Sequence, residues 1–218
     1  MTYQELKEDA AIRTYIRQAD ASLIALGYTE HSFPHVNHVS ATAGYILRTL
    51  GYGERMIELA QIAGYLHDIG NLVNRVEHSQ SGALLAFRLL EERGFPPAEI
   101  ALITTAIGNH DEGTGLPVND LAAAIILADK SDVRRSRVRN KDLTTFDIHD
   151  RVNYSVTSSG LAISSDRTVC RLKLTIDTTY GSVMDYFEIF MDRMIFCRKA
   201  AERLNMSFKL EINGQQLI

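Results

Sequence analysis

The sequence contains a histidine–aspartate doublet, His67-Asp68, where an apolar segment ends and Gly70 follows. Neighbouring side chains on a helix point about 100° apart, so a regular helix would not aim both at one ion. At a helix end the chain can turn, and both side chains can then converge on a metal. Taken alone, the doublet favours a simpler interpretation, in which His67 interacts with the helix dipole and Asp68 is solvated.

Further polar residues occur at the margins of apolar segments in the first 130 residues: His35, His78, His110 and Asp129. Asp129 directly follows the apolar run from Leu121 to Ala128. A carboxylate in that place is expected to be partly buried, and a buried charge needs a partner or a metal. Together with the doublet, these residues indicate a metal site.

The stretch from about residue 33 to 140 resembles the HD-domain phosphohydrolase family. The family's ligand order H…HD…H…H…D is met by His35, His67-Asp68, His78, His110 and Asp129. Short sequence motifs are also similar to those of the family: His35 to Val39 as HxxxV, Leu50-Gly51, Leu66 to Gly70 as LHDIG, and Glu77 to Ala83 as EHxxxGA.

The resemblance implies a two-metal site. One metal would be held by His35, His67, Asp68 and Asp129, and the second by His78 and His110, with Asp68 bridging. Mixed imidazole and carboxylate ligands suit iron, manganese, zinc or nickel. Two such cations acidify a water molecule and stabilise charge on phosphoryl oxygens. The implied activity is hydrolysis of a small phosphate ester, such as a nucleotide, with Asp68 and Lys130 as the catalytic residues.

Two departures argue against the branch that cleaves cyclic di-GMP. Asn109-His110 stands where that branch carries two adjacent histidines, and Gly115-Leu116-Pro117 replaces its GYP tripeptide. Two other functions share the predicted ligand set. Some relatives are di-iron oxygenases, and a binding module could sense a nucleotide without turnover.

A basic run follows Asp129. It begins with Lys130 and continues with Arg134, Arg135, Arg137, Arg139 and Lys141. One interpretation is a phosphate-gathering rim, with Lys130, Arg134 and Arg135 as substrate contacts. The alternative is a solvated helix end with cations near its C-terminal dipole. Lys130 is the strongest candidate for a phosphate contact because it adjoins a predicted ligand.

The remaining histidines and nearby acids are assigned lesser roles. His38 is expected to be a surface residue or to support the ligands indirectly, and His31 and His149 are expected at the surface. Asp111 and Glu112 follow His110 in a glycine-containing loop. They could support the ligands, but we expect them to be exposed to solvent.

The elements that must position these residues are mainly helical. Helical spacing of apolar residues predicts helices over 3–26, 34–51, 54–67, 79–93, 97–109 and 119–135. Short connections between them are typical of a bundle. The fold class is therefore mainly α, with an HD-domain helical bundle over residues 1–147.

The pattern changes in the C-terminal third. Residues 152–164 and 168–178 are rich in Val, Thr and Ile with strand alternation, 182–204 are amphipathic, and 207–212 resemble a last strand. Residues 148–218 are therefore expected to form a small α+β unit with the order ββαβ. This unit could shape the substrate pocket or mediate assembly into a homodimer.

Composition narrows the function classes. The net charge of −4 does not suggest a protein that coats nucleic acid. The longest apolar run is far shorter than a membrane span, and the polar N-terminus is unlike a signal peptide. The two cysteines, without CxxC spacing, indicate neither a disulfide framework nor a zinc finger. We expect a small-molecule phosphate substrate and a cytoplasmic location, with neither membrane nor nucleic acid as a partner.

Overall fold

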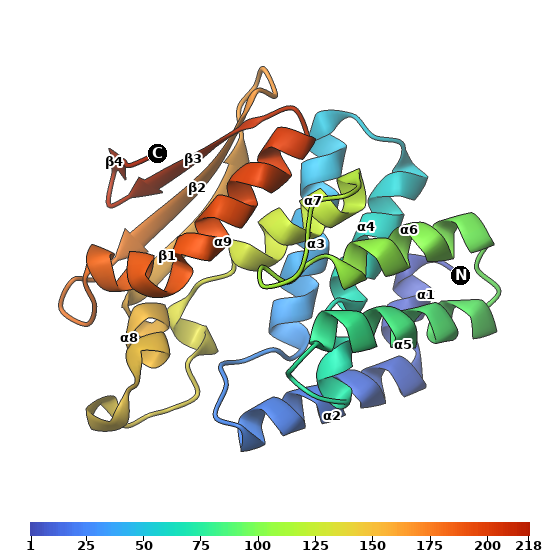
Figure 1. The fold of residues 1–218 in the computed structure, drawn as a ribbon, viewed down its shortest axis with the longest axis horizontal. Coiled ribbons are helices and arrows are strands. Elements are labelled where there is room, and N and C mark those ends of the chain that lie inside the picture. The colour runs from blue at the N-terminus through green and yellow to red at the C-terminus, as the bar shows by residue number, and fades with distance from the viewer.

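The computed structural model describes residues 1–218, and it combines a helical bundle with a four-stranded sheet (Figure 1). The bundle contains α1 (Tyr3–Glu8), α2 (Ala10–Ala25), α3 (Phe33–Leu50), α4 (Glu54–Leu66), the 3-10 helix η1 (Ile69–Leu72), α5 (His78–Glu92), α6 (Pro97–Gly108) and α7 (Asp120–Lys130). The rest of the chain contains η2 (Arg135–Arg137), η3 (Leu143–Thr145), α8 (Ile148–Ser155), β1 (Val156–Ile163), β2 (Val169–Ile176), α9 (Val183–Arg203), β3 (Ser207–Ile212) and β4 (Gln215–Gln216).

Helix α7 is central to the molecule. Its residues Leu121 to Ala128 are fully buried, because α7 packs against α3, α4 and α6 on one side and against α9 on the other. A helix that is apolar all around its circumference is stable only in such surroundings. The hydrophobic core is therefore continuous between the bundle and the sheet, and it includes Ile125, Phe190 and Leu172.

The sheet has the order β1-β2-β3-β4. β1 pairs antiparallel with β2, β2 pairs parallel with β3 through the connecting helix α9, and β3 pairs antiparallel with β4. Alternating residues of β2, among them Cys170, Leu172 and Leu174, are buried. The expected mainly helical fold with a C-terminal α+β part is confirmed. α8 and the short strand β4 are additions to the expected ββαβ order.

Three predicted boundaries were wrong. The first helix is interrupted at Asp9, whose side chain accepts hydrogen bonds from the Ala11 and Ile12 amides and so starts α2. The last bundle helix ends at Lys130 rather than at residue 135. Residues 152–155, expected to start a strand, belong to α8 (Ile148–Ser155), because the Asp147 side chain caps this helix by accepting from the Asp150 amide.

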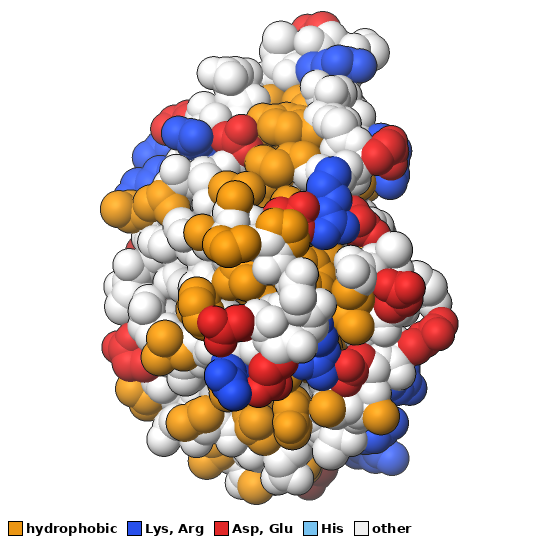
Figure 2. Space-filling model, turned by 90° about the vertical axis from the view of Figure 1, so that its right-hand side faces the viewer, with side chains coloured by type: hydrophobic (Ala, Val, Ile, Leu, Met, Phe, Trp, Pro, Cys, Tyr) orange, Lys and Arg blue, Asp and Glu red, His pale blue; other side chains and the backbone are white.

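The surface is mixed in character. Figure 2 shows the right-hand side of the view in Figure 1, where acidic and basic side chains lie among apolar ones. Scattered exposed apolar side chains are normal for a folded protein. No helix combines the length and the apolar character needed to span a bilayer.

Candidate metal centre

Four buried histidines, His35, His67, His78 and His110, are hydrogen-bonded in the same way. Each has its Nδ1 atom within hydrogen-bonding distance of an oxygen, at 2.8 Å for His35 with Asp132 Oδ2, 2.8 Å for His67 with Gly64 O, 3.2 Å for His78 with Arg75 O, and 2.7 Å for His110 with Ile107 O. A carbonyl or carboxylate oxygen only accepts, so each Nδ1 donates. The Nε2 lone pairs are then free for a metal, which is how metal-binding histidines are usually held.

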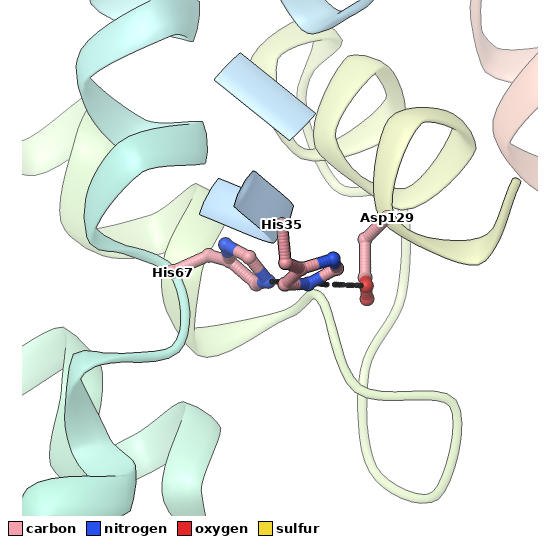
Figure 3. Close-up of side chains that lie close together, drawn as sticks. All are labelled: His35, His67 and Asp129. Atoms are coloured by element: carbon pink, nitrogen blue, oxygen red, sulfur yellow. Dashed lines mark hydrogen bonds and ion pairs between the residues drawn. The ribbon is translucent and has the colours of Figure 1, made fainter. Parts of the chain in front are cut away.

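The first group of donor atoms comprises His35 Nε2, His67 Nε2, Asp68 Oδ2 and Asp129 Oδ1. His35 Nε2 lies 3.3 Å from His67 Nε2, 3.5 Å from Asp68 Oδ2 and 3.4 Å from Asp129 Oδ1. Figure 3 shows His35 between His67 and Asp129. Ligands at about 2.1 Å from a tetrahedral metal lie about 3.4 Å apart. The spacing of this group therefore fits a metal ion.

The second group lies on the other side of Asp68. His78 Nε2 and His110 Nε2 are 3.2 Å apart, and they lie 3.5 Å and 3.9 Å from Asp68 Oδ1. Each oxygen of Asp68 therefore faces a different group of nitrogens. Three of these side chains, His67, Asp68 and His110, also form a compact set of potential metal ligands.

Helix ends bring these side chains together. His35 lies in the first turn of α3, Asp129 in the last turn of α7, and His78 begins α5. His67 caps the end of α4, and Asp68 turns directly into η1. The predicted placement of the doublet at a helix end is confirmed.

A close backbone crossing fixes the second group against the doublet. A methyl group at Gly70 would lie 1.9 Å from His78 O and 2.5 Å from the Gly82 amide nitrogen. Only glycine allows η1 and α5 to approach so closely. This contact sets the position of His78 relative to Asp68, and Asn71 Nδ2 further holds Asp68 by donating to Oδ1 at 3.1 Å.

The first group attracts positive charge. Burial and the charge of Arg137 lower the pKa of His35, but hydrogen bonds to Asp129, Asp132 and Asp68 raise it to about 10 overall. A buried place surrounded by three carboxylates suits a cation. The charge environment agrees with the donor geometry, so the residues present fit a metal.

Asp132 is a site residue that the sequence interpretation missed. It is 2% exposed and accepts from His35 Nδ1. Burial raises its pKa, but His35, Arg137 and Arg134 lower it well below the usual value. Its place three residues after Asp129 could have indicated this role, because α7 ends there and the chain turns back toward His35.

Lys130 and Glu112 lie next to the first group. Lys130 Nζ is 2.8 Å from Asp129 Oδ2 and 2.5 Å from Glu112 Oε2. Arg193 of α9 donates to Glu112 Oε1 at 2.9 Å. The expectation that Glu112 is solvent-exposed was therefore wrong: burial raises the pKa of Glu112, but Lys130 and Arg193 lower it to about 2.

A cavity of about 520 Å³ opens onto the candidate metal ligands Asp68, His78 and Asp129. Its walls include Asp68, His78, Asp129 and Lys130 from the bundle and parts of α8 and α9, as well as Arg75, Arg137, Tyr28 and His31. His31, expected at the surface, lines this cavity and packs edge-to-face on His35. Its position four residues before His35 was the available signal.

Arg134 and Arg135, expected to contact the substrate, do not line the cavity beside the candidate metal ligands. Both line a separate polar hollow together with His38 and residues of β1. Arg134 pairs with Asp132 and Glu30, and Arg135 pairs with Asp177 and lies over the Tyr154 ring. The His38 side chain is 44% exposed and lies 4.0 Å from Asp132.

The HD domain family model matches residues 33–134. The match covers just under half of the chain, and over these residues the chain is similar to the HD domain family. The matched segment contains all the predicted metal ligands. HD domains bind divalent metals, and their members are generally metal-dependent hydrolases. The predicted family is therefore confirmed, whereas the number of metals and the individual ligands stay predictions.

A relative extends this similarity. The uncharacterized protein MJ1020 from Methanocaldococcus jannaschii is 28% identical over 162 residues, which cover 64% of this chain and 62% of the relative. The chain thus spans less than two thirds of that protein's length. The similarity does not point to a particular substrate.

Proposed function

We propose that this HD-domain protein hydrolyses a small phosphate ester, using two metal ions held by six side chains. These are His35, His67, Asp68, His78, His110 and Asp129. The observation that carries the proposal is the position of Asp68, whose two oxygens face separate groups of imidazole nitrogens at the floor of a cavity.

The six side chains have distinct tasks in this proposal. Asp68 joins the two groups, and the Nδ1 hydrogen bonds keep each imidazole turned toward its group. A bound pair of cations would supply an acidified water and neutralise phosphoryl charge. Imidazole and carboxylate donors together suit iron, manganese, zinc or nickel.

Lys130 supports this centre in two ways. Its ammonium holds the Asp129 oxygen that faces away from His35, and so leaves Oδ1 directed at the first group. It also lines the cavity, where a phosphate would approach. We therefore keep Lys130 as a functional residue, with orientation of Asp129 as its main task.

The cavity supports a small-molecule substrate. Its volume of about 520 Å³ lies within the usual range for ligand sites. Tyr28 offers aromatic surface, while Asn153 and Asp150 offer hydrogen-bonding groups. This combination suits the base and sugar of a nucleotide, which we propose as the substrate class.

The proposal is tested by elemental analysis of purified protein, followed by a panel of phosphate monoesters and diesters. We expect two metal ions per chain and turnover of at least one ester. Asp68→Ala should lose both the metal and turnover, whereas Asp192→Ala, which removes an exposed carboxylate from α9, should retain both.

The outcomes separate the competing functions. Two metals retained by Asp68→Ala would contradict the bridging role. Dioxygen consumption by iron-loaded protein without ester hydrolysis would replace the proposal with an oxygenase. A nucleotide held for hours without turnover in the presence of manganese would replace it with a sensor.

A further inference from the structure

Arg137 is a buried cation on the cavity wall. It is 5% exposed, and its Nε and Nη1 atoms donate to the carbonyl oxygens of Glu30 and Asp132 at 2.9 Å and 2.7 Å. Its Nη2 atom has no hydrogen-bond acceptor in the structure, and the one carboxylate near the guanidinium is that of Asp132, whose Oδ2 lies 3.8 Å from Nη1. Buried guanidinium donors are normally satisfied, so Nη2 is available to a ligand.

Arg137 differs from the other cations of the basic run. Arg134, Arg135 and Arg139 form closer ion pairs, with Asp132, Asp177 and Asp20, than the 3.8 Å pair of Arg137 with Asp132. Of the cations from Arg134 to Lys141, Arg137 alone lines the cavity. The short helix η2 brings this about, because it turns Arg137 back toward Glu30.

Arg75 is a second cation of the same cavity. Its carbonyl oxygen accepts from His78 Nδ1, so its backbone is tied to the second group of metal donors. Its guanidinium lies 5.4 Å from the Tyr28 ring centre and donates weakly to Asn71 Oδ1 at 3.4 Å. It forms no ion pair with a carboxylate in this structure.

The two guanidinium groups act on the same region. Arg75 and Arg137 line the same cavity, together with His31 and Asp68. The cavity thus has two cations without close carboxylate partners beside the proposed metal centre.

We propose that Arg75 and Arg137 bind the phosphoryl oxygens of the substrate, and that this substrate carries a terminal phosphate. The inference rests on the proposed function. A phosphate monoester has three non-bridging oxygens and up to two negative charges, whereas a diester has two such oxygens and one charge. Two guanidinium groups in addition to the metal centre match the monoester.

Binding of inorganic phosphate to metal-loaded protein, measured by calorimetry, tests this assignment. A hydrogen bond to a charged group contributes about 1.5–3 kcal/mol, so Arg75→Met should weaken phosphate binding about 10-fold or more. Arg75→Lys should recover part of the loss. Metal content should stay unchanged, and Arg198→Met, on the exposed face of α9, should bind phosphate like the wild type.

Arg137→Met and Arg137→Lys form a second pair, used if circular dichroism shows that they fold. The same loss of phosphate binding is expected. Wild-type phosphate affinity in folded Arg75→Met would overturn the assignment, even if the protein hydrolyses esters. If Arg75→Met loses phosphate binding but the wild-type protein hydrolyses no ester, the assignment of Arg75 and Arg137 stands and the proposed function is wrong.

A pair of model esters tests the substrate class. Arg75→Met should lower kcat/KM for 4-nitrophenyl phosphate at least 10-fold, and for bis(4-nitrophenyl) phosphate by much less. Equal losses for the two esters would contradict a monoester substrate.

Discussion

Lys130 Nζ lies 2.8 Å from Asp129 Oδ2 and so engages the carboxylate oxygen that faces away from His35. Glu112 shares this ammonium group, and Arg193 binds Glu112 from the C-terminal helix α9. This series of ion pairs connects α9, which lies outside the segment matched by the HD family model, to the proposed metal ligand Asp129.

Glu112→Gln should weaken metal binding about 10-fold, as is usual when a group that supports a metal ligand is lost. Without the Glu112 charge, Lys130 attracts Asp129 more strongly and reduces its donation to a cation. Competition with a chromogenic chelator measures the affinity. Glu202→Gln, on the exposed part of α9, is the matched control. Equal affinities for the two variants would show that Glu112 does not position Asp129.

Removal of metal should lower the melting temperature. Ligand at about 1,000 times its dissociation constant stabilises a protein by about 4 kcal/mol. For a chain of this size that corresponds to about 10 °C. Differential scanning calorimetry before and after chelation, and after manganese is restored, measures the shift. An unchanged melting temperature after verified metal removal would contradict a metal centre built into the folded state.

Gly70→Ala should disrupt the second donor group. The added methyl group would meet His78 O and the Gly82 amide, so α5 must move away from Asp68. We expect a lower melting temperature and less than one metal bound at the second group, measured by elemental analysis. Gly53→Ala is the control, because a methyl group there meets no neighbour. Full metal content in Gly70→Ala would show that α5 can shift without losing the site.

Stability should fall with rising pH between about 9 and 12 partly because of Cys170. Burial raises the pKa of this thiol from 9.0 to about 12. In that interval the unfolded chain has released the thiol proton while the folded chain still holds it, so increasing pH favours unfolding. Urea unfolding across this range should show a shallower decline for Cys170→Ala. Identical slopes would indicate that the thiol already titrates in the folded protein.

Most of the fold could be predicted from the sequence, because the helices have strong apolar periodicity and clear ends. Gly51 and Gly94, both with positive φ, follow α3 and α5 closely, where stops were expected. The helix boundaries that were predicted wrongly depend on N-terminal capping. Asp9 and Asp147 each start a helix with a side-chain hydrogen bond, and neither affects the apolar pattern.

The order of the six polar residues predicted a set that the fold does bring together. The supporting residues were harder to predict. Whether Arg134 or Arg137 reaches the cavity depends on one 3-10 turn after α7, and such a turn has no apolar periodicity. The contact between Glu112 and Arg193 joins residues far apart in the chain, which local patterns cannot reveal.

The cavity has a floor and walls of different origin. The proposed metal donors lie within residues 33–134, whereas Tyr28, His31, Asn153, Phe190 and Arg193 lie outside that segment. Proteins that share the HD segment can therefore keep the same reactive floor while their walls diverge. Substrate preference can thus evolve without any change in the metal-binding residues, and similarity in the HD segment alone does not transfer a substrate from one family member to another.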